Sequence, residues 1–171
     1  MGHGYFGEHS FNSRRMIHGS RQSLIQLRNS QRKIPLDVSK IKKAAQVALE
    51  SLGLEDQELS VLITDNQQMA HMHEIWMSKP GPTDVLSFSY RDRKSVFSGL
   101  LGDIAISAEM AAQQARKRSR GTRADQILRQ VIALLIHGIL HLAGHDHVKL
   151  SDKQRMQQQA RRLYRLVEQT L

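Results

Sequence analysis

The 171-residue chain contains no cysteine. Disulfide bonds and thiolate metal sites are therefore excluded, so any transition metal would be held by histidine or carboxylate side chains. A chain without cysteine suits a reducing compartment, and we expect it in the cytoplasm. No apolar run approaches the roughly 18 residues that a membrane-spanning helix requires, and the first residues lack the apolar segment of a secretory signal.

Acidic residues are the minority among the charged ones. The chain has 16 Asp and Glu against 25 Lys and Arg, for a formal net charge of +9. Such an excess favours a polyanionic partner, nucleic acid first, although many basic proteins have no such partner. The basic residues lie on both sides of a histidine-rich segment: Arg116, Lys117, Arg118, Arg120 and Arg123 before it, and Arg155, Arg161, Arg162 and Arg165 after it.

The chain divides into a short tail and one domain. Residues 1–22 are polar and basic, so we expect a disordered N-terminal extension. Their Arg and Ser content would also suit an organelle transit peptide, although the apolar face is poor, and Met16 is a second candidate start. Residues 23–171 are enough for one domain with its own core.

Apolar periodicity predicts four strands and five helices in this domain. The strands are expected near residues 23–28, 59–64, 83–88 and 101–107, and the helices near 36–53, 66–77, 108–118, 123–144 and 152–171. Thr122–Asp125 and Ser151–Gln154 resemble capping boxes at two helix starts. Strands interleaved with helices predict an α/β (α+β) fold, a small four-stranded mixed sheet packed with about five helices, with the histidine-rich helix on a sheet face.

The histidine-rich segment is the most informative part of the sequence. His137 and His141 are four residues apart, so on a helix they lie on one face, about 40° apart in projection. Gly144 can take the left-handed conformation and end that helix. The spacing H-x3-H-x2-G-x2-H matches the zincin signature H-E-x-x-H-x-x-G-x-x-H at every position except the glutamate.

A third ligand is expected after the glycine turn. The zincin spacing favours His147 over His145, and three imidazoles with an open fourth position are typical of a catalytic zinc site. Gly138 stands where a zincin peptidase has its glutamate base, so we do not expect peptidase activity. Asp146 is expected to orient a ligand histidine, or else to be an ordinary turn residue.

Two other histidines are not expected to bind metal. His71 and His73 are two residues apart, so they do not face each other on a helix. His73 begins an H-E pattern, but Met77 occupies the position of the second histidine.

Three segments resemble one known family. The segment from His137 to His147 is similar to the signature H-G-x-L-H-L-x-G-x-D-H of the YbeY endoribonucleases. The segment from Pro82 to Phe88 resembles the family's P-T-D-V-L-S-F, and the segment from Gly102 to Ser107 resembles its G-D-I-x-I-S. Residues 29–37 are also similar to the opening of the family, so the resemblance covers about 23–171.

The resemblance implies a bacterial endoribonuclease specific for single strands. It implies a role in ribosomal RNA maturation, notably at the 3′ end of the small-subunit RNA, and in ribosome quality control. One Zn²⁺ per chain is expected on His137, His141 and His147. The expected partners are ribosomal RNA and the small ribosomal subunit, with a ribosomal protein or an assembly GTPase, and we expect no membrane partner.

The resemblance leaves the catalytic base open. Asp84 and Asp103 are weak candidates, and Lys79 with the basic cluster from Arg116 to Arg123 is expected to bind RNA. The family usually has an arginine shortly before P-T-D-V, where this chain has Met77, and Lys79 lies two residues away. This departure favours an alternative, a ribosome-assembly factor that binds RNA without cutting it and in which zinc is structural.

Overall fold

The computed structural model describes residues 24–90, 99–115, 121–145 and 150–171, with the first two side chains of the last range excepted. Within these ranges the chain forms four strands and five helices in the expected order. They are β1 (Ile25–Asn29), α1 (Val38–Ser51), β2 (Glu58–Thr64), α2 (Asn66–Met77), β3 (Val85–Ser89), β4 (Leu100–Ser107), α3 (Ala108–Gln114), α4 (Arg123–Leu142) and α5 (Leu150–Thr170).

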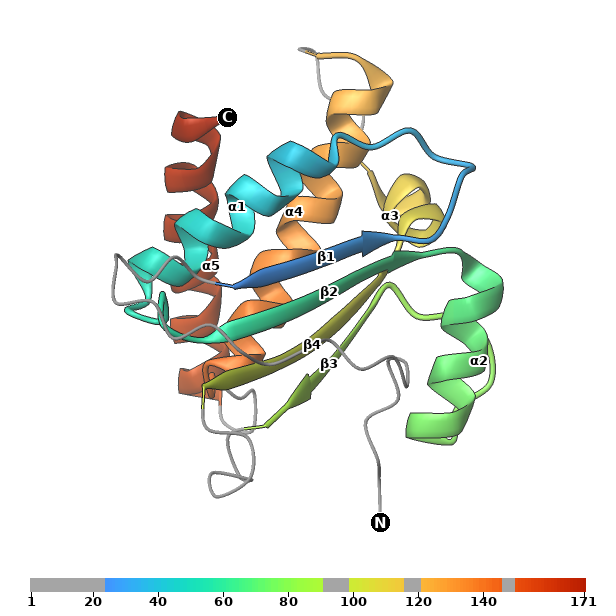
Figure 1. The fold of residues 1–171 in the computed structure, drawn as a ribbon, viewed down its shortest axis with the longest axis horizontal. Coiled ribbons are helices and arrows are strands. Elements are labelled where there is room, and N and C mark those ends of the chain that lie inside the picture. The colour runs from blue at the N-terminus through green and yellow to red at the C-terminus, as the bar shows by residue number, and fades with distance from the viewer. Residues whose placement is uncertain (1–23, 91–98, 116–120, 146–149) are drawn as a thin grey trace, which may run out of the picture.

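The four strands form one mixed sheet in the order β1-β2-β4-β3 (Figure 1). β1, β2 and β4 run parallel, and β3 is the antiparallel edge strand paired with β4. Parallel neighbours need a crossover, which α1 supplies between β1 and β2. The α/β prediction with a four-stranded mixed sheet and five helices is therefore confirmed.

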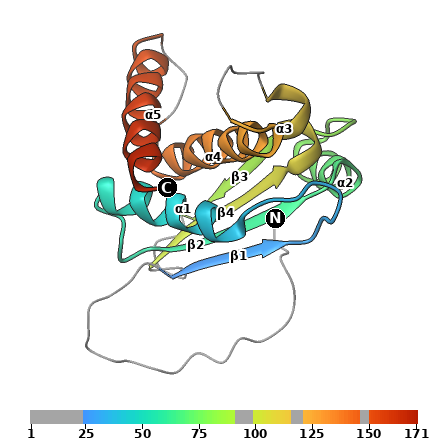
Figure 2. The same cartoon turned by 90° about the horizontal axis from the view of Figure 1, so that it is seen from above.

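Two apolar clusters lie on the two faces of the sheet. The larger cluster joins α1, α4 and α5 to the face that carries Ile104 and Ile106 (Figures 1 and 2). The smaller cluster joins Met69 of α2 to Leu86 and Ala105 on the opposite face. Successive side chains of β4 thus alternate between the two clusters, as a strand requires.

The long helix α4 forms where its caps predicted. The hydroxyl of Thr122 accepts a hydrogen bond from the backbone N–H of Asp125 at 3.2 Å, and the Asp125 carboxylate accepts from the Thr122 N–H at 2.8 Å. This is the expected capping box, and its hydrogen bonds lower the pKa of Asp125. Ten of the 20 residues of α4 are buried, so half of the helix belongs to the core.

Two helix boundaries differ from the prediction. α3 ends at Gln114, not near residue 118, because Ala115 is extended and the Arg123 guanidinium donates to the carbonyls of Ala112 and Ala115. α5 already begins at Leu150, so Ser151 lies inside the helix and the capping box expected there is wrong.

The N-terminal extension lies outside the described residues. None of the helices in the described ranges is long and apolar enough to cross a membrane.

Candidate metal centre

His137 and His141 converge at the C-terminal end of α4. Their Nε2 atoms lie 3.1 Å apart, and their ring centroids lie 4.6 Å apart with the ring planes at 82°. Both side chains are half-buried, while Ile136, Gly138 and Leu140 beside them are buried. The four-residue spacing therefore brings the two imidazole nitrogens together on one face of the helix, as predicted.

Gly138, which follows His137, explains how closely α4 approaches the sheet. A Cβ at Gly138 would lie 2.9 Å from Cδ1 and 3.1 Å from Cγ2 of Ile104, which points from β4 into the core. Position 138 therefore faces the sheet and has no room for a side chain. The glutamate that a zincin carries at this position would be driven into the apolar core.

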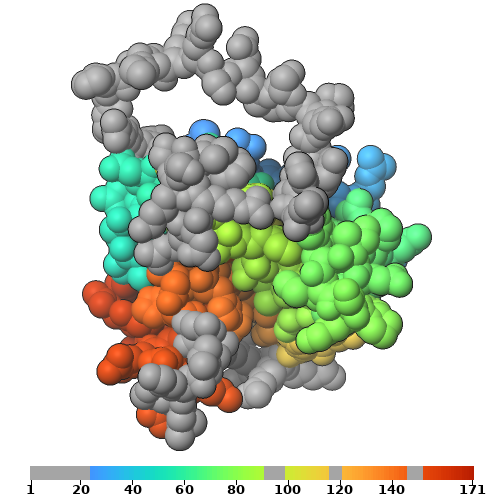
Figure 3. Space-filling model, turned by 90° about the horizontal axis from the view of Figure 1, so that it is seen from below, coloured from blue at the N-terminus to red at the C-terminus, as the bar shows by residue number. Residues whose placement is uncertain are grey.

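A second glycine permits the same approach from the sheet side. Gly102 of β4 has φ +153°, and a Cβ there would lie 2.2 Å from the carbonyl oxygen of Phe88 and 2.8 Å from Cδ2 of Leu142. Figure 3 shows α4 (orange) beside β3 (yellow-green), with α2 (green) on the other side of β3. The two glycines together let the histidine-bearing turn pack against β3 and β4.

Immediately after the histidine pair the chain turns sharply. Gly144 has φ +91°, its N–H donates to the carbonyl of His141 at 2.9 Å, and the N–H of His145 donates to that of Leu140 at 3.0 Å. This is a Schellman motif, so the expected helix end at Gly144 is confirmed. His147 and Asp146 lie outside the described residues, and His145 is half-buried.

The two imidazole nitrogens of His137 and His141 have a separation that fits a zinc ion. Two imidazole nitrogens on one tetrahedral Zn²⁺, each at about 2.0–2.1 Å, are about 3.3 Å apart, close to the observed 3.1 Å. Within the described ranges, no third His, Cys, Asp or Glu joins the pair into a metal-binding group. His147, the predicted third ligand, lies outside the described residues, so it stays a prediction.

Asp84 directly precedes β3 and, within the described residues, does not join the histidine pair in a metal-binding group. Its carboxylate accepts hydrogen bonds from the Val85 N–H at 2.8 Å and from Nε2 of Gln114 at 3.0 Å. Gln114 in turn accepts from Gln130 of α4 at 3.0 Å. The network ties Asp84 to the end of α3 and, through Gln114, to α4.

Asp103 lies on the opposite face of the sheet from α4. Its neighbour Ile104 contacts α4, so alternation along β4 turns Asp103 toward the α2 side. The Tyr90 hydroxyl donates to its carboxylate at 2.6 Å, and Ser60 donates a further hydrogen bond. Burial raises the pKa of Asp103 despite these hydrogen bonds. The structure thus brings neither weak base candidate to the histidine pair.

The residues expected to bind RNA differ in exposure and in hydrogen bonding, and some lie outside the described residues. Arg123 is occupied by the end of α3, as described above. Lys79 is exposed on the loop that follows α2, and Met77, at the position of the family arginine, is 44% exposed. Arg116, Lys117, Arg118 and Arg120 lie outside the described residues.

Within the described residues, His71 and His73 form no metal-binding group with the pair. His71 is exposed on α2, and Nδ1 of His73 lies 2.8 Å from the Gly81 carbonyl oxygen, which ties α2 to the loop before β3.

Sequence reasoning did not locate the basic hollow beside the histidine helix. Arg155, Arg162 and Arg165 of α5 line it together with Gly144 and His145. The arginines were visible in the sequence as a basic run, and their spacing by seven and three residues would have shown that they share a helix face. The sequence does not specify that this face of α5 lies beside Gly144 and His145, because that contact depends on how α5 packs against the rest of the domain.

Two convergent imidazoles on a helix packed against a mixed sheet are typical of metal-dependent hydrolases. The sequence pattern of the family described as Endoribonuclease YbeY matches residues 26–168. The chain therefore belongs to the endoribonuclease YbeY family, as its three motifs predicted.

Individual relatives agree with this assignment. Proteins named endoribonuclease YbeY are 42% identical over 112 residues in Kineococcus radiotolerans and 38% identical over 130 residues in Beutenbergia cavernae. The alignments cover 62% of this chain and 62% of the first relative, and 72% of this chain and 83% of the second. The solution structure of TM1509 from Thermotoga maritima is similar in fold, with a TM-score of 0.57 and 18% identity over 84% of this chain and 89% of that one.

Proposed function

We propose that this chain is a zinc-dependent endoribonuclease that cleaves single-stranded RNA. The observation that carries the proposal is the 3.1 Å convergence of the His137 and His141 nitrogens in a chain of this family. We further propose that it acts in the cytoplasm in ribosomal RNA maturation, notably at the 3′ end of the small-subunit RNA, and in ribosome quality control. Its partners would be the small ribosomal subunit and a ribosomal protein or an assembly GTPase.

His137, His141 and His147 would hold the metal in this proposal. When bound, Zn²⁺ polarises a phosphoryl oxygen and lowers the pKa of a water molecule, both of which favour phosphodiester hydrolysis. Gly138 keeps a carboxylate out of the site because its position faces Ile104. Position 138 thus lacks the proton carrier that a zincin peptidase has there, a group worth about 10²–10⁴ in rate.

The two carboxylates that were candidates for the catalytic base, Asp84 and Asp103, are both engaged elsewhere in the described structure. Asp84 accepts hydrogen bonds from Val85 and Gln114, and Asp103 faces the other side of the sheet. We therefore propose that neither carboxylate accepts the proton of the attacking water. Lys79 and the basic cluster before α4 would attract the RNA backbone.

Metal analysis of the purified protein tests the site directly. We expect close to one zinc per chain, lost in His137→Ala and His141→Ala together with RNA cleavage and kept in the matched control His73→Ala. Circular dichroism and a melting curve must show that the variants are folded, because losing a metal can unfold a site. If His145→Ala loses the metal and His147→Ala keeps it, the third ligand is wrongly assigned.

A second candidate function is ribosome assembly without RNA cleavage. The exposed Met77 favours it, since an apolar side chain cannot hold a phosphate as the family arginine could. The two functions separate in a strain that lacks its own copy of the gene. If folded His141→Ala protein restores ribosomal RNA maturation there, the assembly function is correct; if maturation fails while RNA binding persists, the nuclease function is correct.

A further inference from the structure

A polar hollow of about 760 Å³ lies between the end of α4 and α5. Gly144 and His145 line it from the turn after α4, and Asp152, Arg155, Arg162 and Arg165 line it from α5. Because the Gly144 N–H is bonded to the carbonyl of His141, the hollow begins one turn from the candidate metal centre.

Cations dominate this hollow. Three guanidinium groups face one carboxylate, and in the described part of the chain the two ion pairs involve other residues, so neither Arg155 nor Arg162 is neutralised there. Arg165 uses its Nε to donate to the Arg161 carbonyl at 3.3 Å, and its terminal nitrogens hold further donors. Gln158 and Gln159 add neutral amide groups to the lining. Planar guanidinium groups bind phosphate oxygens in pairs, so this lining suits a phosphate chain.

The arginines also have the spacing of an extended site. Residues 155, 162 and 165 lie on one face of α5, and the ten helical steps from the first to the last span about 15 Å along the axis. A row of this length exceeds a single phosphate group, so it can contact more than one phosphate of an extended chain.

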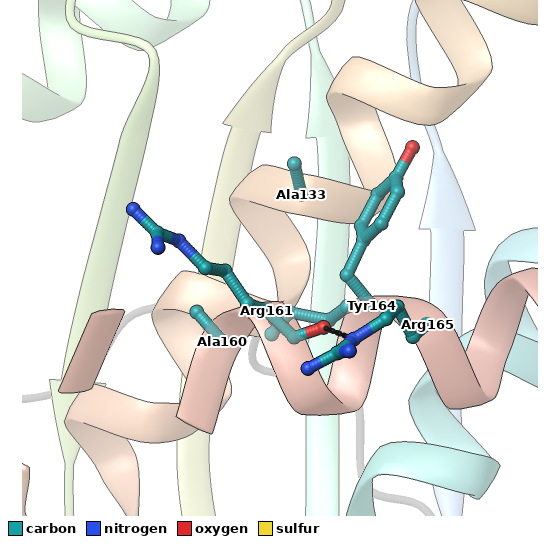
Figure 4. Close-up of a pocket in the computed structure, with 6 residues that line it drawn as sticks. Ala133, Ala160, Arg161, Tyr164 and Arg165 are labelled. Carbon is teal, nitrogen blue, oxygen red and sulfur yellow. Dashed lines mark hydrogen bonds between the residues drawn. The ribbon is translucent and has the colours of Figure 1, made fainter. Parts of the chain in front are cut away.

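The two sides of α5 differ in character. A second hollow, of about 600 Å³, has an apolar lining that includes Ala133, Ala160 and Tyr164, with Arg161 and Arg165 beside them (Figure 4). Arg161 and Arg162 are therefore adjacent in sequence and both exposed, yet they line different hollows.

We propose that Arg155, Arg162 and Arg165 bind consecutive phosphates of the RNA strand next to the cleaved bond and direct that strand along α5 to the histidine pair. This inference rests on the proposed endoribonuclease function. In this proposal the polar side of α5 positions the substrate, whereas the net positive charge of the chain does not suffice to do so.

A pair of matched double variants tests the assignment. Arg155→Gln with Arg162→Gln removes two charges from the polar hollow, and Lys153→Gln with Arg161→Gln removes two exposed charges from the same helix outside it. A fluorescein-labelled single-stranded oligouridylate serves as the probe, with anisotropy measured across salt concentrations and probe integrity checked on a gel. Melting curves show whether both variants are folded.

We expect the Arg155/Arg162 variant to bind on the order of tenfold more weakly than the wild type. Its plot of log affinity against log salt should be shallower by about 1.4, since each phosphate contact of a single strand contributes about 0.7. In cleavage assays its KM should rise while kcat stays close to that of the wild type. The Lys153/Arg161 variant should differ little from the wild type in all three quantities.

Two results would overturn the inference. Equal losses in both double variants would show that affinity follows total charge. A salt slope of the Arg155/Arg162 variant equal to that of a wild type that cleaves RNA would show that these arginines touch no phosphate. The proposed function fails separately: if the wild type binds the probe with the expected dependence on Arg155 and Arg162 but never cleaves RNA, the phosphate site is supported and the nuclease assignment is not.

Discussion

Replacing Gly138 with alanine tests how closely α4 packs against the sheet. The added methyl would lie 2.9, 3.1 and 3.2 Å from three carbons of Ile104. Ile104 is fully buried, so its side chain can move only by displacing other core residues. The substitution therefore sets a local gain in helix propensity against crowding in the core.

The expected magnitude follows from these two terms. Overpacking a core by a methyl group costs about 1–3 kcal/mol, whereas Gly→Ala inside a helix gains about 1 kcal/mol. We expect Gly138→Ala to lower the free energy of unfolding by about 1 kcal/mol, and the melting temperature by about 2–4 °C for a chain of this size. Ile104→Val removes the Cδ1 atom behind the shortest contact and by itself costs about 0.5–1.5 kcal/mol.

The wild type, Gly138→Ala, Ile104→Val and the double variant form a double-mutant cycle. Urea unfolding followed by circular dichroism would measure the free energy of unfolding of all four proteins. The double variant should be more stable than the sum of the single changes predicts, by about 0.5 kcal/mol or more. Ala133→Gly, a half-buried position of the same helix, measures the propensity term separately. If Gly138→Ala is as stable as the wild type or more stable, and the cycle shows no coupling, the close approach of α4 to β4 is refuted.

Three further predictions concern activity, and a fourth concerns stability. The wild-type protein should not cleave casein, because position 138 cannot carry a base; metal-dependent cleavage would contradict the proposed chemistry. Met77→Arg should raise the RNA cleavage rate if a phosphate contact is missing there, and an unchanged rate would indicate that Lys79 or another cation already supplies it. Asp103→Asn should leave the cleavage rate unchanged, since the side chain faces away from α4. Because burial raises the pKa of Asp103, ionising it costs stability, so the wild type should lose stability relative to Asp103→Asn as the pH rises above about 4; parallel stability curves would refute this.

The local rules of the sequence predicted most of the secondary structure. The apolar periods placed four strands and five helices, Thr122 and Asp125 formed their capping box, and Gly144 ended α4 in the left-handed conformation. These features depend on residues within a few positions of one another. The early end of α3 has a different origin: Arg123, eight residues beyond Ala115, donates to the carbonyls of Ala112 and Ala115.

The sequence by itself determined the family, the order of the elements and the shared face of His137 and His141, because motif spacing and helical periodicity are local properties. Only the tertiary structure decided which faces meet. It showed that Gly138 is a packing position against Ile104 as well as a missing base, that Asp103 faces away from α4, and that the α5 arginines border His145. Each of these depends on contacts between segments far apart in the chain, which the spacing of residues within one segment does not specify.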